Sequence, residues 1–361
     1  MGPDTSPIIL IRCDGSYDVG FGHVIRCLAL ADELCSVHEC RVKFLMRYGP
    51  EGIDMARTQG YSVLTPSHEI QAQDITWPLS LIRRAPVDMV VFDIRDDFPR
   101  HAMDSLRESG TVVAVIDDIS PRCLSADLGF FPPVPQLDRI DWRGSPGQRF
   151  VGWDWVLLRR DIQELRNLPK PQQERVQVLV TMGGSDPHGF TLKAIRACQR
   201  VRKNIEVRVV LGPGFSAHQE LQKLVNGLND HMQIYSNIKN LPELIHQSDL
   251  VVGAFGNTAY EAAALKRFGM YLCGTPDHVE SASRYMQAGF GVSLGLGVEV
   301  SEEQLALAIE KYSNSSLEIS IDQPGTNNNS IDGLGVTRIA EKLVQEIQGS
   351  RNGIQQAVAA T

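Results

Sequence analysis

The feature that most limits the possible folds of this chain of 361 residues is a series of seven short apolar runs. Helix-like patterns separate the runs. Most of the runs are apolar at successive positions, as in strands that are buried on both faces. Amphipathic helical patterns follow the first, fifth and seventh runs. Strands that alternate with helices predict βαβ units on parallel sheets. The runs are 8–11, 42–45, 89–92, 112–116, 176–180, 207–211 and 250–252.

A polar segment with two prolines, 167–174, is the predicted domain boundary. Each half of the chain opens with a strand, a glycine-rich turn and an amphipathic helix. This repeat predicts an α/β fold with two Rossmann-like domains that face each other across a cleft. The predicted domains are 7–168 and 174–348, with a mobile loop over 314–330 and a flexible tail over 349–361.

The charge balance excludes several classes of partner. With 35 Lys and Arg against 43 Asp and Glu, the net charge of −8 gives no general attraction to nucleic acid or anionic lipid. No apolar run nears the ~20 residues that cross a bilayer, and the first residues do not resemble a signal peptide. Seven scattered cysteines without a Cys-x-x-Cys pair indicate reduced thiols. We therefore expect a cytoplasmic monomer or weak homodimer without membrane insertion. Any phosphate site must be formed by a few local groups and not by a broad basic surface.

The first candidate site is the loop 12–28, where a strand runs into a helix that starts near Gly22. The free N–H groups at a helix start bind anions. Position 25 is Ile where a dinucleotide fingerprint requires glycine, which disfavours nicotinamide binding. The helix start keeps His23 neutral and available as a base, and Asp14 is predicted to accept a hydrogen bond from its ring. The alternative is a His that only packs or caps, beside a turn-forming Asp.

The second candidate site is the turn Gly183-Gly184-Ser185-Asp186-Pro187, between a buried strand and a helix. Its glycines allow close backbone approach, and the helix start suits a phosphate. The alternative is a tight turn in which Ser185 or Asp186 is the N-cap and Pro187 is the first helical residue.

The third candidate site covers 253–261. One interpretation is a capping box, Thr258-x-x-Glu261, which occurs in many helices without special function. The other places a diphosphate on the N–H groups around Asn257 and Thr258, and two ribose hydroxyls on the Glu261 carboxylate.

Two acidic doublets, Asp96-Asp97 and Asp117-Asp118, follow predicted strands. Such carboxylates would suit a metal-bound diphosphate, although loop aspartates are usually caps and turn residues. The nine histidines form no HExxH motif and no ligand cluster with cysteine. We therefore predict no metal and no cofactor.

The three sites together resemble the UDP-2,4-diacetamido-2,4,6-trideoxy-β-L-altropyranose hydrolases of the pseudaminic-acid pathway and the related spore-coat polysaccharide proteins. The resemblance extends from about Ile8 to Val344 and implies a GT-B fold. The matching residues are Arg12, Asp14, Ser16, Gly20, Gly22, His23, Arg26, Cys27, Leu28, Ile116, Asp117, Asp118, Leu157, Leu158, Arg159, Gly183 to Pro187, Gly256, Thr258, Glu261, Ile331 to Gly335 and Arg338.

The resemblance implies an enzyme that releases UDP from an activated amino or acetamido deoxysugar without a metal. His23 would be the base that activates water for attack at the anomeric carbon, with Asp14 beside it. The implied partner is therefore a small UDP-sugar. The residues expected to bind it are Arg12, Gly20, Gly22, Arg26, Gly183, Gly184, Ser185, Gly256, Asn257, Thr258, Glu261 and His278.

Three segments depart from the family pattern. The stretch 273–280, which includes His278, replaces a loop with an Asn-Gln pair that recognises the sugar or acceptor. The apolar segment 130–135 replaces a polar one, and Gly152-Trp153-Asp154-Trp155 replaces Gly-Pro-x-Tyr, so the two tryptophans either pack or stack on sugar. Two alternatives therefore stay open: a GT-B glycosyltransferase with a sugar, lipid or peptide acceptor, and a non-catalytic nucleotide-sugar-binding protein.

Overall fold

The computed structural model describes residues 6–67, 74–84, 86–202, 204–225, 231–236, 238, 240–314 and 330–359. Apart from its two end residues, the loop predicted over 314–330 lies outside these ranges, as do residues 360 and 361 of the predicted tail. Within the ranges, no helix is long and apolar enough to cross a membrane. All seven cysteines are free thiols, as predicted.

The N-terminal domain is built on a parallel sheet of seven strands in the order β3-β2-β1-β4-β5-β6-β7. Because β1 lies between β2 and β4, the order reverses beside it, which opens a crevice at the carboxyl ends of these strands. The strands are β1 (Ile8–Cys13), β2 (Arg41–Leu45), β3 (Ser62–Leu64), β4 (Met89–Asp93), β5 (Val112–Ile116), β6 (Leu128–Phe131) and β7 (Gln148–Val151). The helices are α1 (Gly22–Ser36), α2 (Pro50–Thr58), α4 (Trp77–Ile82), α5 (Arg100–Glu108), and the short η1 (Pro121–Ser125), η2 (Pro135–Arg139) and η3 (Trp153–Trp155).

The C-terminal domain repeats this plan with six parallel strands in the order β10-β9-β8-β11-β12-β13. The strands are β8 (Val176–Thr181), β9 (Ile205–Leu211), β10 (Met232–Ser236), β11 (Leu250–Ala254), β12 (Phe268–Cys273) and β13 (Gly291–Leu296). The helices are α6 (Arg160–Arg166), α7 (Phe190–Arg200), α8 (His218–Val225), α9 (Leu241–Gln247), α10 (Asn257–Ala264), α11 (Pro276–Gln287) and α12 (Glu302–Asn314), and the last helix of the chain is α13 (Gly335–Ala359).

All seven predicted runs are strands, and the three predicted helices are α1, α7 and α10. The strands that the sequence did not indicate are short, contain glycine, or lie at a sheet edge. β10, for example, is an edge strand without a fully buried residue, so it lacks the continuous apolar pattern of a central strand. The prediction of two parallel-sheet domains across a cleft is confirmed.

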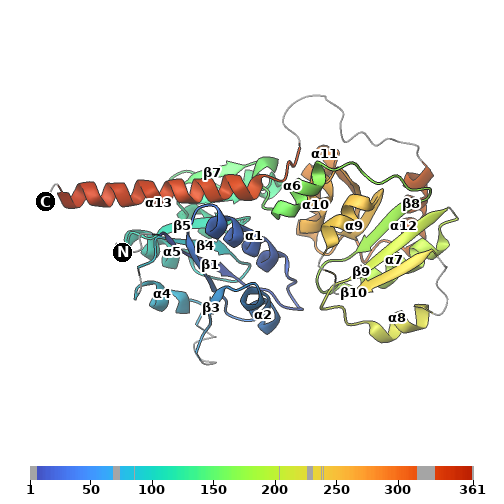
Figure 1. Cartoon of the computed structure of the whole chain (residues 1–361), viewed down its shortest axis with the longest axis horizontal. Coiled ribbons are helices and arrows are strands. Elements are labelled where there is room, and N and C mark those ends of the chain that lie inside the picture. The colour runs from blue at the N-terminus through green and yellow to red at the C-terminus, as the bar shows by residue number, and fades with distance from the viewer. Residues whose placement is uncertain are drawn as a thin grey trace.

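Helix α13 returns to the N-terminal domain, which corrects the predicted domain limits. Figure 1 shows this helix running along the N-terminal lobe and away from the other one. The tail predicted from residue 349 is helical as far as Ala359, and Arg351 forms two hydrogen bonds of 2.8 Å with Asp88 next to β4. An amphipathic periodicity contains no information on which sheet a helix covers. The apolar side of α13 enters the N-terminal core through Val336, Ile339, Ala340, Leu343 and Ile347.

The segment before the predicted boundary belongs to the opposite domain. Trp153 and Ile162 pack into the core beneath the C-terminal sheet, so the chain has already crossed over before residue 167. The ring centroids of Trp153 and Phe290 are 5.1 Å apart, and those of Trp155 and Phe150 are 4.6 Å apart. Both tryptophans therefore pack against aromatic side chains, in agreement with the packing interpretation.

Candidate functional site

Two adjoining cavities lie between the domains. The first, about 350 Å³, is lined by glycine-rich turns of both domains, and we call it the glycine-rich cavity. The second, about 640 Å³, is lined mainly by polar and charged side chains, and we call it the polar chamber. The residues that line both, and so mark where the cavities meet, are Val19, Gly22, Phe255, Gly256, Asn257 and His278.

Most of the predicted binding residues line the glycine-rich cavity. Arg26 and the predicted base His23 line only the polar chamber. Arg12 and Asp14 line neither cavity. The residues of the glycine-rich cavity that the sequence predicted are Gly20, Gly22, Gly183, Gly184, Ser185, Gly256, Asn257, Thr258, Glu261 and His278.

The N-termini of two helices from different domains meet at the junction of the cavities. Asn257, the first residue of α10, donates from Nδ2 to the carbonyl of Gly22, the first residue of α1, at 3.1 Å. No side chain caps either helix, and Gly256 rather than Thr258 is the N-cap of α10. The capping-box interpretation is therefore wrong. Uncapped N–H groups and two helix dipoles make this junction suited to an anion.

The turn after β8 agrees in part with its predicted capping interpretation. Helix α7 begins only at Phe190, and the carboxylate of Asp186 accepts from the N–H groups of Phe190 and Thr191, both at 2.8 Å. Asp186 is therefore a capping residue, while Pro187 is not the first helical residue. Gly183 and Gly184 come before this cap and face the glycine-rich cavity.

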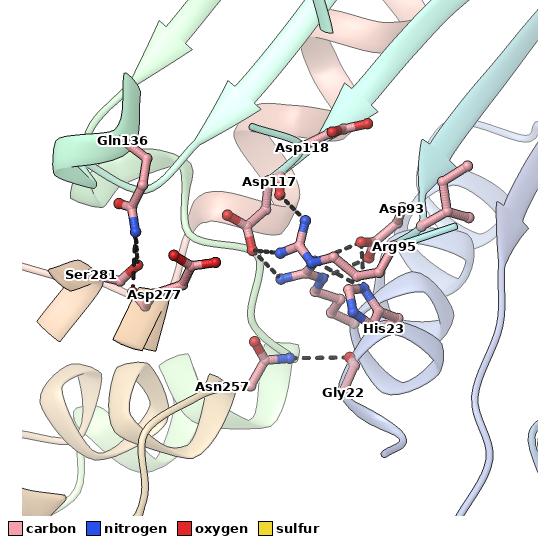
Figure 2. Close-up of polar contacts among 12 residues, drawn as sticks. Gly22, His23, Asp93, Arg95, Asp117, Asp118, Gln136, Asn257, Asp277 and Ser281 are labelled. Carbon is pink, nitrogen blue, oxygen red and sulfur yellow. Dashed lines mark hydrogen bonds and ion pairs between the residues drawn. The ribbon is translucent and has the colours of Figure 1, made fainter. Parts of the chain in front are cut away.

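His23 is held by a carboxylate that the sequence interpretation missed. Its Nδ1 lies 2.6 Å from Oδ1 of Asp93, which is 0% exposed, while the His23 side chain is 20% exposed toward the polar chamber. Cys13 and Asp93 are register partners at the ends of β1 and β4, which places this carboxylate beside the start of α1. With Nδ1–H donating to Asp93, the other ring nitrogen is left for a proton from the chamber (Figure 2).

Arg26 holds Asp93 in turn. It donates from Nε to Oδ2 at 2.6 Å and from Nη2 to Oδ1 at 2.5 Å, and its Nη1 reaches Oδ2 of Asp117 at 3.1 Å. Burial alone would raise the pKa of Asp93, but the Arg26 cation and His23 lower it well below its usual range. Asp93 is therefore ionised, and Arg26, predicted to bind substrate, holds this carboxylate beside His23 and also lines the polar chamber.

The His23 ring bonds to Asp93 and not to Asp14 as predicted, and Arg12 and Asp14 line neither cavity. Asp14 accepts from the backbone N–H groups of Arg47 at 2.7 Å and Tyr48 at 3.2 Å, and its other oxygen lies 2.5 Å from Arg12. Arg12 is only 1% exposed and also pairs with Asp96 at 2.6 Å. Both residues therefore hold the loop 12–28 in place through buried contacts. The signal for Asp93 was present, because it follows a predicted strand, and the carboxyl ends of parallel strands share one edge.

Glu261 lies one turn into α10 and lines the glycine-rich cavity, although the residue is only 7% exposed. Burial raises its pKa from 4.5 to about 7, and Arg159, whose Nε is 4.0 Å from Oε1, opposes this rise. A carboxyl group that titrates near neutrality in a cavity is typical of functional sites.

Glu261→Gln is expected to stabilise the protein at high pH. The folded state retains a proton up to about pH 7 that the unfolded chain releases near pH 4.5, so stability falls as the pH rises between these values. In urea unfolding at pH 8.5, the free energy of unfolding of the glutamine variant should exceed that of the wild type by about 3 kcal/mol. At pH 4.5 the two free energies should be nearly equal. A wild type that is as stable as the variant at pH 8.5 would contradict the raised pKa.

Arginines bind most of the acidic doublets. Asp118 pairs with Arg122 at 2.5 Å, and Asp117 accepts from Arg95 as well as Arg26, both at 3.1 Å. Within the described ranges, no group of three or more His, Cys, Asp or Glu side chains is placed to hold a metal ion. The doublets thus line the polar chamber, and Figure 2 shows one of them, Asp117 and Asp118.

Two of the segments that differ from the family pattern, 130–135 and 273–280, are linked through Gln136 at the wall of the polar chamber. Gln136, next to the apolar segment 130–135, donates from Nε2 to the carbonyl of Asp277 at 3.1 Å and to the hydroxyl of Ser281 at 3.0 Å (Figure 2). Arg284 of α11 pairs with Asp138 of η2 at 2.7 Å. The two segments, far apart in sequence, are thus one structural unit.

Comparison with known proteins agrees with this architecture. No family model matches the chain. It is 23% identical over 341 residues to the spore coat polysaccharide biosynthesis protein SpsG of Bacillus subtilis, covering 92% of this chain and 96% of that protein. It is 19% identical over 289 residues to the UDP-2,4-diacetamido-2,4,6-trideoxy-beta-L-altropyranose hydrolase of Campylobacter jejuni, covering 79% and 98%. An uncharacterized protein of Methanocaldococcus jannaschii is 28% identical over 269 residues, 71% of this chain but only about half (54%) of that relative.

Solved structures establish the fold. MurG of Acinetobacter baumannii superimposes with a TM-score of 0.65 at 13% identity, covering 94% of this chain and 99% of that one. UDP-GlcNAc 2-epimerase of Neisseria meningitidis, bound to UDP-GlcNAc, gives 0.62 at 12% identity, covering 94% and 100%. The predicted GT-B fold is therefore confirmed.

Proposed function

We propose that the protein is a nucleotide-sugar hydrolase that releases UDP from an activated amino or acetamido deoxysugar. The observation that carries the proposal is the His23–Asp93 pair, with 2.6 Å between Nδ1 and Oδ1, in a chamber that adjoins a nucleotide-sized cavity. A histidine oriented by a buried carboxylate is the usual arrangement of a general base.

The nucleotide would occupy the glycine-rich cavity. Its diphosphate would lie at the junction, on the uncapped N–H groups of α1 and α10, and its ribose hydroxyls would bind Glu261. The sugar would extend into the polar chamber. In support, the C. jejuni relative is a hydrolase of a UDP-activated diacetamido sugar, and the N. meningitidis epimerase has UDP-GlcNAc bound to the same fold.

In the proposed reaction, a water molecule in the polar chamber gives a proton to the free ring nitrogen of His23 and attacks the anomeric carbon. The bond from that carbon to the β-phosphate oxygen breaks, and its electron pair leaves with UDP. Water enters from the chamber and UDP leaves toward the glycine-rich cavity, so the configuration inverts. The helix N-termini stabilise the charge that develops on the diphosphate.

A glycosyltransferase is the second candidate, because the polar chamber, at about 640 Å³, is larger than the glycine-rich cavity and has room for an acceptor beside a sugar. CalG4, a solved structure with this fold, is the calicheamicin glycosyltransferase by name. In a transferase, the His23–Asp93 pair would activate an acceptor hydroxyl instead of water.

A screen for UDP release distinguishes the candidates. UDP-sugars with hydroxyl, amino and acetamido substituents are incubated with the protein, with and without sugar, lipid and peptide acceptors. Rapid release without an acceptor supports the hydrolase. Slow release that an acceptor accelerates many-fold supports the transferase, and binding without turnover would contradict both and favour a non-catalytic binding protein.

Gly212→Ala is expected to weaken UDP binding at least 10-fold. A Cβ atom at this position would lie 2.3 Å from the carbonyl oxygens of both Gly183 and Gly184, so the turn proposed to bind phosphate would have to move. Calorimetric titration with UDP measures the loss. Gly349→Ala is the matched control, since its Cβ would meet no atom within 4 Å and the change should leave UDP affinity unchanged. An unchanged affinity in the Gly212 variant would contradict the placement of the diphosphate.

A further inference from the structure

His278 lies at the junction of the two cavities, beside the site proposed for the diphosphate. Six residues line both the glycine-rich cavity and the polar chamber, and among them His278 alone has an ionisable side chain. The others offer only backbone groups, apolar side chains and the amide of Asn257. On the proposed function, the bond that breaks lies at this junction, so His278 is the side chain next to the departing phosphate.

The fold fixes His278 at the start of a helix. It is the third residue of α11, and its N–H donates to the hydroxyl of the N-cap, Thr275, at 3.2 Å. Pro276 occupies the first turn, and the wall formed with Gln136 holds this turn against the N-terminal domain. The ring is therefore presented to the junction by an anchored element and not by a free loop.

The charged surroundings of His278 come from both domains. Arg95 and Asp117 face it from the N-terminal domain, and Asp277 and His188 face it from the C-terminal domain. Burial lowers the pKa of His278, and Arg95 lowers it further. A lowered pKa favours the neutral ring, which keeps one N–H donor. This N–H can donate a hydrogen bond to an anionic oxygen.

We propose that His278 donates a hydrogen bond to the β-phosphate oxygen that leaves the sugar. This inference rests on the proposed function and adds a second histidine to it. His23 takes the proton of the attacking water from the chamber side, and His278 stabilises the oxygen that gains the electron pair on the opposite side. No proton moves to the phosphate in this step, because UDP departs as an anion. The stretch 273–280 thus replaces the Asn-Gln loop of the resembling family with an imidazole donor.

The test compares UDP with UMP, which lacks the β-phosphate. For His278→Ala we expect the affinity for UDP to fall about 10-fold or more, and the affinity for UMP to stay within about twofold. Calorimetric titration of both nucleotides measures this ratio without knowledge of the sugar. His101→Ala, an exposed change on α5, is the control and should alter neither affinity.

Several outcomes overturn the inference. Equal losses for UDP and UMP would make His278 a structural residue, and no loss for either would remove it from the site. His278→Gln keeps an N–H donor, so it should retain more UDP affinity than the alanine variant; an equal loss would contradict the donor role. If the wild type binds UDP no better than UMP, the placement of the β-phosphate itself fails, and the proposed function fails with it.

Turnover provides the second readout. Once the screen has identified a UDP-sugar that releases UDP, His278→Ala should lower kcat about 10- to 100-fold and His278→Gln less. Turnover within threefold of the wild type in the alanine variant would overturn the inference and leave the proposed function standing. A wild type that turns over none of the UDP-sugars would instead count against the proposed function, while the UDP-to-UMP comparison still decides where His278 acts.

Discussion

Replacing His23 with alanine is expected to lower kcat for UDP release by about 10³-fold, while the affinity for UDP stays within about threefold. The ring lies in the polar chamber and not in the glycine-rich cavity, so its removal takes away the base without touching the proposed nucleotide contacts. Water is a weak nucleophile, and only a positioned base removes its proton during the attack. Steady-state kinetics and calorimetric titration with UDP measure the two quantities.

A split between the two quantities is the informative result for this variant. Parallel losses of kcat and UDP affinity would make His23 a binding residue and contradict its role as base. His101→Ala again provides a histidine control on an exposed face of α5. Circular dichroism should show that both variants retain the wild-type fold, because Asp93 keeps its two hydrogen bonds from Arg26 when His23 is replaced, and His101 is exposed.

Asp93→Asn is expected to lower kcat by about 10²- to 10⁴-fold and to destabilise the protein as well. An amide offers one acceptor oxygen where the carboxylate offers two, and Arg26 donates to both oxygens of Asp93. With its NH₂ group at the position of Oδ1, the amide would donate to Nδ1 of His23 and stabilise the wrong ring tautomer. Arg26, which is almost fully buried, would also lose its buried charged partner and keep only the partly exposed Asp117, and breaking a buried pair costs about 3 to 5 kcal/mol.

Kinetics at low temperature and urea unfolding separate the two effects of Asp93→Asn. The loss of kcat is expected to persist at temperatures where the variant is fully folded. Asp54→Asn, on an exposed part of α2, should change neither quantity. A folded Asp93 variant with kcat within threefold of the wild type would contradict the role of this carboxylate. Unchanged stability would contradict its pairing with Arg26.

The fold was predictable where burial leaves a continuous apolar run. Central strands such as β4, with every residue buried, have this pattern, whereas the edge strand β10 does not. The destination of α13 was not predictable, because an amphipathic helix fits any apolar surface and its periodicity is the same on either domain. The long-range pair between Arg351 and Asp88 specifies the choice only in the folded chain.

The candidate site was predictable where it consists of local backbone. Glycine-rich turns followed by a helix predicted the junction of α1 with α10, whose N–H groups do not enter a count of charges. The partner of His23 was not found, because sequence proximity favoured Asp14 on the same loop. The register of β1 with β4 brings Asp93 to the ring from 70 residues away. The contact between Gln136 and α11 could not be predicted, because no sequence pattern near either segment indicates it.

The central claim is that water attacks the anomeric carbon of a UDP-sugar. Turnover in water enriched in ¹⁸O, followed by mass spectrometry of both products at early times, tests it most directly. The account predicts one ¹⁸O atom in the released sugar and none in UDP. An ¹⁸O atom in the β-phosphate of UDP would place the attack on phosphorus and contradict the account.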